Sequence, residues 1–364
     1  MTKRKEEKKK LRVLMIEPYY GGSHKSFLDG LIGRLPHEVD LMELPARKWM
    51  WRMRLSAPYF ADLLHSLGRE YDVILCSTFI DVASFRGLSP EWVRRVPVLT
   101  YFHENQFEYP VQVGDERDLH FALTNLTTAL ASDRIAFNSK YNLETFLKGV
   151  EDILKVSYDL KLNDPCGAIR SRASVIHPAI DFSSIDEVKP QHEGGSPVVL
   201  WNHRWEHDKD PDTFFKALFK LDAEGLDFGV VVLGESFTEI PPIFNEAKAR
   251  LSGRILHMGY VKDRRDYASW LRRSTIAVST AQHEFFGIAA VEAARAGCVP
   301  LVPRRLSYPE LFDEKFLYDD RELLTRLRNL IILGKRLSDD EAREMTEPYS
   351  WSVLAKKFER WLCG

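Results

Sequence analysis

Short apolar runs alternate along the chain with segments whose apolar residues recur at helical spacing. Residues 13–16 form the first run, and a turn-rich stretch with Pro18, Gly21 and Gly22 follows it. Residues 24–35 then repeat apolar positions every three or four residues, which predicts an amphipathic helix. Further strands are predicted at 39–44, 73–76, 98–102, 134–138 and 175–178. This alternation of strand and helix predicts α/β layers with parallel sheets.

The same pattern resumes after residues 181–197, where Ser, Asp, Glu, Lys, Pro and a Gly pair predict a linker. Beyond it we expect a helix at 211–221 and strands at 198–201, 228–233, 255–258, 276–279 and 299–302. We therefore expect two Rossmann-like domains, at 11–180 and 198–345, whose parallel sheets face a central cleft. Residues 346–364 contain a helix with an apolar face, which we expect to pack back toward the first domain.

The composition fits a protein with two hydrophobic cores. The 364 residues are 45% apolar and 29% charged, and no run approaches the roughly 18 apolar residues of a membrane span. Residues 1–10 are lysine-rich without an apolar segment behind them, which predicts a disordered basic tail and no secretory signal. Four widely spaced cysteines indicate reduced thiols in a cytoplasmic protein. The net charge of −2 gives no global electrostatic case for nucleic-acid binding, so RNA would require a local patch.

The most informative motif lies at residues 283–292, between a predicted strand and an apolar helix. A strand, a short loop and a helix start leave unpaired amides that can bind a diphosphate, here those of Gly287, Ile288 and Ala289. Glu284 lies before these amides, and Glu292 lies one turn into the helix. Their carboxylates can accept hydrogen bonds from a sugar on one side of the diphosphate and a ribose on the other.

With two glutamates separated by seven residues, the chain resembles the retaining glycosyltransferases of family four, which have the GT-B fold. The resemblance implies that Glu284 holds the hydroxyls of the donor sugar and Glu292 holds the nucleotide ribose. It also assigns Phe286, Gly287 and Ile288 to the donor site. Glutamates at a solvated helix start are the alternative interpretation.

Residues 201–211 follow the first strand of the second domain and contain two cations. The family clamps the pyrophosphate here with an Arg and a Lys. Arg204 and Lys209 match that pattern, although Asn-His stands where Gly more often precedes the Arg. Two cations would neutralise the charge that grows on the leaving diphosphate, and a surface ion-pair cluster is the alternative. Asp208 and Asp210 also match an Asp-x-Asp metal motif, but Asp commonly caps helices before a proline, so we expect no metal and no cofactor.

The first domain contributes a glycine turn and a histidine. Gly21 and Gly22 follow the first strand, where glycine lets the backbone approach a ligand closely, and the resemblance assigns them to the donor. The resemblance places His103 beside the donor sugar, and a structural histidine is the alternative. The expected catalytic residues are thus His103, Glu284, Arg204 and Lys209. Without a well-placed carboxylate nucleophile, retention suggests front-face attack, with the protein supplying orientation and electrostatics.

A narrower resemblance covers nearly the whole chain from Leu11 onward. Residues 13–25, 44–54, 102–106 and 200–209 are similar to those of tRNA-queuosine mannosyltransferases. The resemblance implies transfer of mannose from GDP-mannose to the cyclopentenediol of queuosine in the anticodon of tRNA-Asp. The mild acidity of the chain is unusual for an enzyme that binds tRNA.

Several residues of the first domain are candidates for acceptor binding. Residues 47–54 interleave cations with two tryptophans, so the cations can bind phosphates and an indole can stack on an unstacked base. A loop whose tryptophans pack inward is the alternative. Asp81 is either a partner of an acceptor hydroxyl or a helix cap. The full set of acceptor candidates is Ser23, His24, Arg47, Lys48, Trp49, Trp51, Arg52, Asp81, Glu104, Asn105 and Gln106.

Three other functions stay open from the sequence. A GT-B glycosyltransferase could act on a lipid, a glycan or a small molecule, and an exposed amphipathic basic helix in the first domain would favour a lipid. A catalytically inactive nucleotide-sugar or tRNA-binding protein would lack Glu284, Arg204 or Lys209, and all three are present. A sugar-nucleotide epimerase would need acid–base carboxylates such as Glu17 in the first domain.

Overall fold

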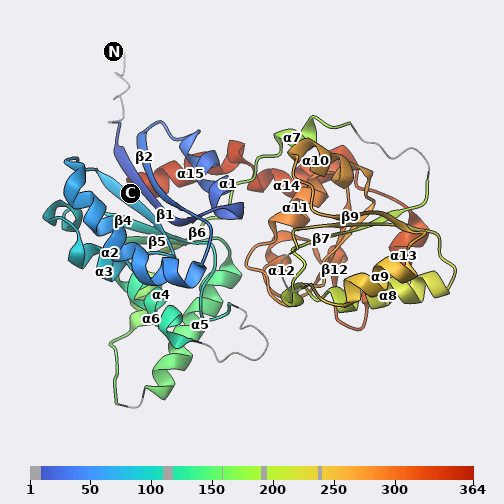
Figure 1. The fold of residues 1–364 in the computed structure, drawn as a ribbon, viewed down its shortest axis with the longest axis horizontal. Coiled ribbons are helices and arrows are strands. Elements are labelled where there is room, and N and C mark those ends of the chain that lie inside the picture. The colour runs from blue at the N-terminus through green and yellow to red at the C-terminus, as the bar shows by residue number, and fades with distance from the viewer. Residues whose placement is uncertain (1–9, 110–117, 158, 190–194, 237–239) are drawn as a thin grey trace, which may run out of the picture. The chain divides into compact units, whose positions relative to one another are not determined.

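The computed structural model describes residues 10–109, 118–157, 159–189, 195–236 and 240–364. The chain divides into two compact units (Figure 1). Unit 1 comprises Met1–Ala179 and Leu354–Gly364, and unit 2 comprises Ile180–Val353. All but the last residue of the predicted basic tail lies outside the described residues.

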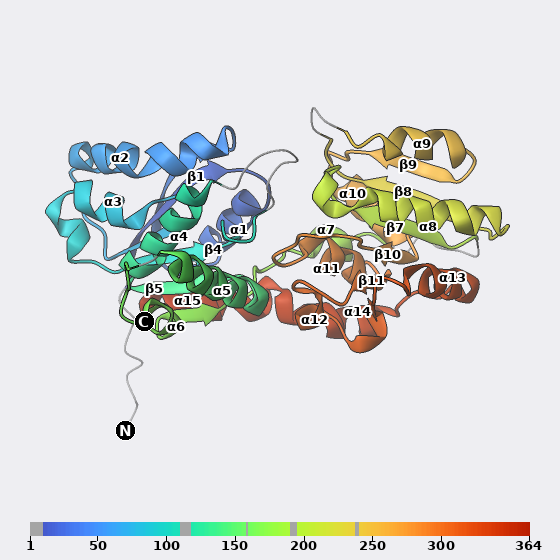
Figure 2. The ribbon, with the colours of Figure 1, turned by 90° about the horizontal axis from the view of Figure 1, so that it is seen from below.

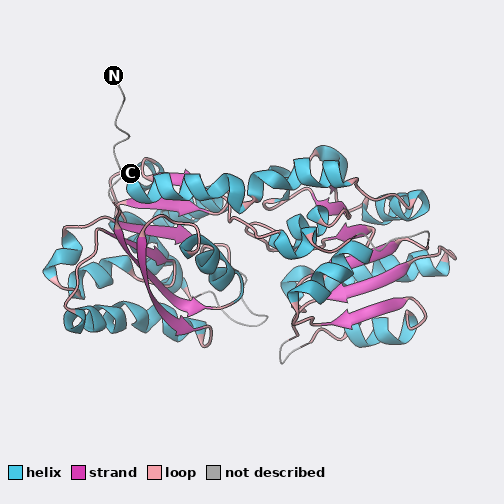
Figure 3. Ribbon diagram, turned by 90° about the horizontal axis from the view of Figure 1, so that it is seen from above, coloured by secondary structure: helices cyan, strands magenta, loops and turns pink. Residues whose placement is uncertain are grey.

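Unit 1 is built on a six-stranded parallel sheet in the order β2-β1-β3-β4-β5-β6. Helices cover both faces of this sheet (Figure 3), so residues 13–16 of β1 are at most 1% exposed. Such burial on both faces explains why the strands appear in the sequence as continuous apolar runs. The strands are β1 (Arg12–Tyr20), β2 (Glu38–Pro45), β3 (Val73–Ser77), β4 (Val98–Phe102), β5 (Arg134–Phe137) and β6 (Ala173–Val175).

The helices of unit 1 come from the first half of the chain and from its end. Helix α15 (Trp351–Cys363) enters unit 1 at Leu354. Its Phe358 is fully buried and packs against Phe27, with ring centroids 5.2 Å apart. The apolar face of the C-terminal helix therefore completes the core beside the sheet. The other helices are α1 (Gly22–Ile32), α2 (Trp49–Leu67), α3 (Val82–Leu88), η1 (Glu91–Arg94), α4 (Leu119–Ala131), α5 (Lys140–Val156) and α6 (Pro165–Arg170).

Unit 2 is built on a second six-stranded parallel sheet, in the order β12-β11-β10-β7-β8-β9. Its strands are β7 (Val198–Asn202), β8 (Gly229–Leu233), β9 (Ile255–Gly259), β10 (Ile276–Val278), β11 (Val299–Pro303) and β12 (Leu317–Tyr318). Successive side chains of a strand point to opposite faces of the sheet, so alternate residues of these strands pack into two different cores.

Helices α8 (Pro211–Ala223) and α9 (Ile243–Arg250) lie side by side on one face of this sheet (Figure 2). Helices α7 (Ser183–Asp186), α10 (Arg264–Arg273) and α11 (Ile288–Arg295) pack on the other. The remaining helices of unit 2 are η2 (His207–Lys209), α12 (Tyr308–Leu311), η3 (Glu314–Phe316), α13 (Leu323–Leu333), α14 (Asp339–Thr346) and η4 (Glu347–Tyr349).

Three predicted elements differ from the observed ones. β1 continues through Pro18, where the sequence predicts a turn. The register of β1 against β2 shifts between Glu17 and Tyr20, so Pro18 lies at an irregularity of the strand. A proline without an N–H is tolerated at such an irregularity. The last strand of the first sheet is Ala173–Val175 instead of 175–178. Residues 49–54 are helical because α2 begins at Trp49, so the loop interpretation of this segment is wrong.

The predicted linker, residues 181–197, begins as a packed part of unit 2. Phe182, Ile185 and Val188 are at most 7% exposed and lie in the core of that unit. The composition of this segment suggests a linker because its apolar residues are few, but those few are buried. Residues 190–194 lie outside the described residues.

Candidate active site

Each sheet reverses its strand order at one position. The reversal lies between β7 and β10 in unit 2 and between β1 and β3 in unit 1. In sheets of this kind, ligands bind beyond the carboxyl ends of the strands at such a switch point. The predicted donor cations follow β7 and the paired glutamates follow β10, whereas several acceptor candidates follow β1, β3 and β4. The topology therefore gathers the predicted residues of each unit at the edge where a ligand is expected.

The loop before α11 has the features of an anion-binding turn. Gly287 precedes the helix with a φ of 105°, which favours glycine, and a Cβ there would lie 3.0 Å from Cε1 of Tyr308. The Tyr308 hydroxyl is fixed 2.7 Å from Oγ of Ser279. In the described part of the chain, no hydrogen-bond acceptor faces the amides of Gly287, Ile288 and Ala289. These amides can therefore bind an anionic ligand.

Phe286 was expected to bind the donor, but its side chain points into the core of unit 2. The side chain is 2% exposed and packs on Tyr349, with ring centroids 5.5 Å apart. Its carbonyl accepts a 2.6 Å hydrogen bond from Oγ of Ser307. Phe286 therefore anchors the loop in the core of unit 2.

Lys209 and Glu284 come together although 75 residues separate them in the sequence. Nζ of Lys209 lies 3.6 Å from Oε2 of Glu284 and 3.0 Å from Oδ2 of Asp208, and donates to the His283 carbonyl at 2.6 Å. Lys209 is only 6% exposed. Burial alone would raise the pKa of Glu284, but Lys209 and neighbouring histidines reverse that effect and lower it. Glu284 is therefore an ionised acceptor beside a buried cation.

Two histidines beside this pair are held neutral. Burial, followed by the charge of Lys209, lowers the pKa of His203 and of His283 to about 4. At neutral pH, each ring can therefore donate one hydrogen bond and accept another without adding charge. The sequence pattern assigned no role to His203 or His283, and it gave Asp208 only the role of a possible helix cap.

Arg204 is placed differently from Lys209. Its side chain is exposed and pairs with Glu206, Nη2 to Oε2, at 3.0 Å. Of the two cations predicted to clamp the pyrophosphate, one is therefore buried next to Glu284, and the other lies at the surface of unit 2. The clamp itself stays a prediction.

Glu292 is held by residues of α10 that sequence analysis did not identify. Arg264 donates to Oε1 and the Tyr267 hydroxyl donates to Oε2, both at 2.7 Å. Burial and the charge of Glu292 raise the pKa of Tyr267 well above its usual value, so the phenol stays protonated. Asn202 donates to the same hydroxyl at 2.7 Å. Each carboxylate oxygen keeps a further lone pair, so Glu292 can still accept from vicinal hydroxyls.

In unit 1, His24 bridges two carboxylates, Glu17 on β1 and Glu104 in the loop after β4. Its Nδ1 lies 2.9 Å from Oε2 of Glu17, and its Nε2 lies 3.2 Å from Oε2 of Glu104. Ser77 donates to Glu17 at 3.0 Å, and Thr78 donates to Glu104 at 2.8 Å. Burial would lower the pKa of His24, but the two carboxylates outweigh it and raise the pKa to about 10. The group is an imidazolium between two carboxylates, with one net negative charge.

His103 lies against this cluster as an uncharged ring. The ring centroids of His103 and His24 are 4.1 Å apart. Burial, with a contribution from the His24 charge, holds the pKa of His103 well below its usual range. Its carbonyl accepts a 2.6 Å hydrogen bond from Nδ2 of Asn138. A neutral His103 can hydrogen-bond a sugar hydroxyl but is not a strong acid near neutral pH.

The glycine turn before α1 is built by close packing and by a positive φ. A Cβ on Gly21 would lie 2.5 Å from the Cβ of Ala46, and Gly22 has a φ of 53°. Ser23 follows as an exposed residue of the first helical turn. The predicted turn is therefore confirmed, whereas its contact with a ligand stays a prediction.

Three of the acceptor candidates have structural partners. Asp81 caps α3 by accepting from the amide of Ser84 at 3.2 Å and from its hydroxyl at 2.6 Å. Asn105 is fully buried and donates to Oδ1 of Asn142 at 2.9 Å. The amide of Gln106 donates to Oδ1 of Asn125 at 2.9 Å. The cap interpretation of Asp81 is therefore confirmed, and Asn105 has a structural role in the core. For Gln106 the hydrogen bond is made by the backbone N–H, so acceptor binding by its side chain stays a prediction.

The two tryptophans at the start of α2 have opposite environments. Trp49 packs against Phe121, with ring centroids 5.1 Å apart, whereas Trp51 is 61% exposed. Arg47 and Lys48 are exposed, and Arg52 donates to the Pro45 carbonyl at 3.2 Å. The packing interpretation is thus confirmed for Trp49, whereas stacking of Trp51 on a base stays a prediction.

An exposed apolar row continues along α2. Its members, spaced four residues apart, are between 39% and 61% exposed, and we call them the α2 row: Trp51, Leu55, Tyr59, Leu63 and Leu67. The cations at the start of α2 lie beside this row, so the exposed side of the helix combines apolar and basic side chains, while its other side is buried in unit 1. No helix among the described residues is long and apolar enough to cross a membrane.

The Asp-x-Asp pattern is used for local structure. Asp210 caps α8 by accepting from the amide of Thr213 at 3.1 Å, and Asp208 pairs with Lys209. A search of the described residues found no cluster of three or more His, Cys, Asp or Glu side chains suited to a metal ion.

Comparison with known families matches both units. Residues 12–180 match the family described as tRNA-queuosine alpha-mannosyltransferase N-terminal, and residues 183–321 match glycosyl transferases group 1. Two solved structures share the fold at low identity. The catalytic domain of starch synthase IV from Arabidopsis thaliana has a TM-score of 0.71 and 14% identity, with 98% of this chain and 99% of that chain covered. Sucrose-phosphate synthase from Thermosynechococcus elongatus has a TM-score of 0.69 and 13% identity, with 97% and 98% covered.

Curated relatives extend the comparison along the chain. A tRNA-queuosine alpha-mannosyltransferase from Drosophila melanogaster is 35% identical over 326 residues, covering 87% of this chain and 86% of the relative. A GDP-mannose-dependent phosphatidylinositol dimannoside mannosyltransferase from Mycobacterium tuberculosis is 26% identical over 172 residues, covering 45% and 44%. The two parallel sheets and the structural neighbours confirm the GT-B fold class. The chain is therefore a glycosyltransferase and belongs to the tRNA-queuosine alpha-mannosyltransferase family.

Proposed function

We propose that this protein transfers mannose, with retention, from GDP-mannose to the cyclopentenediol of queuosine in the anticodon of tRNA-Asp, in the cytoplasm. The relative from Drosophila melanogaster supports the acceptor, and the GDP-mannose-dependent relative supports the donor. The observation that carries the proposal is the buried Lys209 beside an ionised Glu284, directly before the amides that begin α11. A cation, a carboxylate and a helix start match the diphosphate and the hydroxyls of a nucleotide sugar.

In this proposal, unit 2 binds the donor. The amides at the start of α11 and Lys209 bind the diphosphate, and Glu284 accepts hydrogen bonds from the sugar hydroxyls. Glu292, held by Arg264 and Tyr267, accepts from the ribose hydroxyls. The cations stabilise the charge that develops on the departing diphosphate, so the reaction needs no metal ion.

Unit 1 binds the acceptor in this proposal. Glu104, fixed by His24 and Thr78, accepts a hydrogen bond from one hydroxyl of the cyclopentenediol. His103 donates to a hydroxyl of the sugar in its neutral form. The acceptor oxygen forms its bond to the anomeric carbon on the face from which GDP departs. Its proton passes to an oxygen of the departing diphosphate, which preserves the configuration without a covalent intermediate.

The test is transfer of radiolabelled mannose from GDP-mannose to tRNA-Asp with and without queuosine, in the presence of a metal chelator. Label on the queuosine-containing tRNA alone is the expected result. Label on both tRNAs would refute queuosine as the acceptor. Failure in the chelator that is restored by added divalent metal would refute the metal-free mechanism.

A lipid acceptor is the second candidate, and one observation favours it. The α2 row lies beside a basic helix start, which is the arrangement of helices that bind membrane surfaces. The same transfer assay, with vesicles of phosphatidylinositol added as an acceptor, decides between tRNA and lipid. Label in the lipid phase, with none on tRNA, would replace the first proposal with the second.

A further inference from the structure

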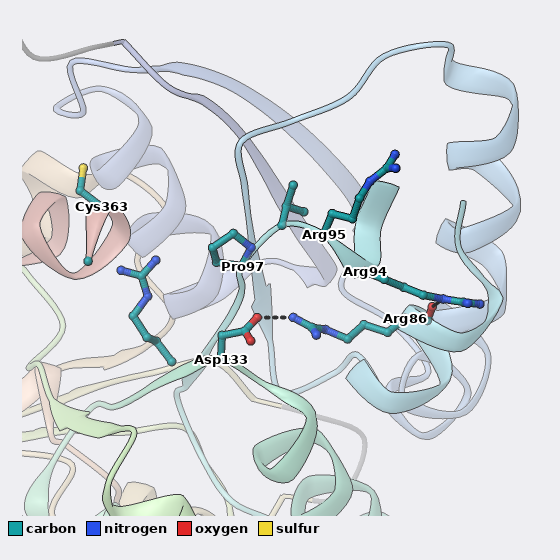
Figure 4. Close-up of a pocket in the computed structure, with 9 residues that line it drawn as sticks. Arg86, Arg94, Arg95, Pro97, Asp133 and Cys363 are labelled. Atoms are coloured by element: carbon teal, nitrogen blue, oxygen red, sulfur yellow. Dashed lines mark hydrogen bonds and ion pairs between the residues drawn. The ribbon is translucent and has the colours of Figure 1, made fainter. Parts of the chain in front are cut away.

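A pocket of unit 1 lies away from the proposed acceptor site. Pro97 directly precedes β4, and Asp133 and Arg134 lie at the start of β5, whereas His103 and Asn138 follow the same two strands. Since the strands are parallel, the pocket lies at the opposite edge of the sheet, about 17 Å away for five residues at 3.3 Å each. The pocket measures about 460 Å³ and is lined by Arg86, Arg94, Arg95, Val96, Pro97, Asp133, Arg134, Cys363 and Gly364 (Figure 4).

The charge of the pocket lining is strongly positive. Four guanidinium groups share it with two negative groups, the carboxylate of Asp133 and the α-carboxylate of Gly364. Figure 4 shows Arg86 reaching Asp133, whereas Arg95 extends away from that carboxylate. Arg95 is also exposed, and its nearest carboxylate, on Glu91, is 3.7 Å away. The lining therefore keeps a net positive charge, and the part of it that a ligand can reach lies on the exposed side chains of Arg94 and Arg95.

Two hydrogen-bond donors of the pocket residues lack acceptors. Nε of Arg86 and one terminal nitrogen of Arg134, Nη1, are buried without a hydrogen-bond partner among the described residues. The other terminal nitrogen of Arg134 donates to the Leu362 carbonyl at 3.1 Å. Buried donors without acceptors cost free energy, and an anionic ligand would relieve that cost. Both nitrogens are covered by the protein, so they support an anion site only if the guanidinium groups turn toward the ligand.

The lining also indicates which anion fits. It contains no aromatic ring to stack on a base and no hydroxyl or amide side chain to bind a sugar or a base edge. Guanidinium groups bind phosphate oxygens, often in pairs. The pocket is therefore suited to phosphate groups alone, as in the sugar–phosphate backbone of a nucleic acid.

We propose that this arginine pocket binds backbone phosphates of the acceptor tRNA, away from the nucleoside that receives the sugar. The inference rests on the proposed function for the identity of the RNA. With a net charge of −2, the chain has no global attraction for RNA, so affinity must come from local patches. The arginine pocket supplies such a patch at a second place on unit 1.

The test uses the full chain with both exposed arginines removed, Arg94→Ala and Arg95→Ala. We expect KM for queuosine-containing tRNA-Asp to rise roughly tenfold, with kcat and the KM for GDP-mannose unchanged. The slope of log affinity against log salt should shrink by about 0.7–0.9 for each phosphate that the variant no longer binds. Lys216→Ala with Arg250→Ala is the matched control, because both are exposed cations with a carboxylate four residues away.

Filter binding of the tRNA without donor separates this inference from the proposed function. If the unmodified protein transfers mannose, but the arginine variant binds tRNA as the control does, the inference is overturned and the proposed function stands. If the protein binds tRNA without transferring mannose, the proposed function fails and a loss of binding in the variant still supports the pocket. Absence of tRNA binding by the unmodified protein would overturn the inference as well.

Inorganic phosphate distinguishes a backbone site from a site for a free anion. Calorimetry should show phosphate binding far weaker than tRNA binding, and the variant should lose affinity for tRNA. Tight phosphate binding that the variant loses, with tRNA affinity unchanged, would reassign the pocket to a small anion and overturn the inference.

Discussion

In unit 2, Lys209 is buried beside Asp208 and Glu284, and each interaction has a different consequence. Its ammonium balances two carboxylates that would otherwise repel each other at close range. The same charge keeps His203 and His283 neutral. The cation proposed for catalysis is therefore also part of the local structure, and its removal should affect both.

Two substitutions separate these roles. Glu284→Gln keeps the size of the side chain but removes the acceptor charge, so kcat should fall by about 100-fold or more with little change in unfolding free energy. Lys209→Ala leaves partly buried carboxylates without their cation, so it should lower both kcat and the unfolding free energy, the latter by about 3 kcal/mol. Steady-state transfer rates and urea unfolding measure the two effects. Equal stability of Lys209→Ala and the unmodified protein would contradict the structural role.

The His24 cluster predicts a pH dependence of stability. The pKa of His24 is about 10 in the folded chain and near 6.5 in the unfolded chain, because Glu17 and Glu104 outweigh its burial. Its stabilisation is therefore complete below about pH 6.5 and is lost as the pH rises toward 10. Neutral His103 and Tyr19 are further titratable groups in contact with the His24 ring.

His24→Gln tests this dependence. At pH 7 the variant should be less stable by about 3 kcal/mol, since two buried carboxylates lose their cation. Chemical unfolding between pH 6 and 10 should show a decline for the unmodified protein that is much smaller for the variant. Parallel curves for the two proteins would show that His24 is not charged in the folded state.

Only some residues of the candidate active site could be predicted from the sequence. Glu284, Glu292 and Gly287 lie in one ten-residue motif, so local strand–loop–helix spacing identified them. Arg264 and Tyr267 hold Glu292 from α10, more than twenty residues away in sequence. Their role depends on how α10 packs beside α11, and no local sequence pattern indicates that packing.

At the scale of elements, α2 shows how one helix divides similar residues between core and surface. Trp49 and Trp51 are two residues apart, so they lie on different sides of the helix. Trp49 packs with Phe121, and Trp51 begins the exposed α2 row. Sequence analysis recognised the cation–tryptophan pattern, but the burial of each indole depends on the rotation of the helix against the sheet.

Alanine at each tryptophan should therefore have a different effect. Trp49→Ala should lower the unfolding free energy by about 2 kcal/mol, because it leaves space beside Phe121. Trp51→Ala should leave stability within about 0.5 kcal/mol but raise the KM for tRNA roughly tenfold, since base stacking is removed. Leu63→Ala is the control, an exposed member of the α2 row without an aromatic ring. An equal rise in KM for Leu63→Ala would indicate apolar contact instead of stacking.

For the whole molecule, the division into two units predicts which unit is stabilised by GDP, the nucleotide left after mannose transfer. GDP at one hundred times its Kd should stabilise the site that binds it by about 2.7 kcal/mol. Hydrogen exchange should slow at the start of α11 and near Lys209 in unit 2, whereas α2 in unit 1 should be unaffected. Equal slowing in α2 would contradict the assignment of the nucleotide diphosphate to unit 2.

The sequence by itself determined the class of fold and the strand–loop–helix segment that contains Glu284 and Glu292. Apolar runs of strand length indicate strands buried on both faces of a parallel sheet, and the residues around Glu284 indicate a helix start. Both features could be predicted because they are local properties of the chain. Only the tertiary structure decided which side chains meet. It placed Glu17 and Glu104 on the two sides of His24, buried Lys209 against Glu284, and gathered four arginines at one edge of unit 1. These groups come from segments far apart in sequence, and their charges and pKa values depend on burial and proximity that only the folded chain creates.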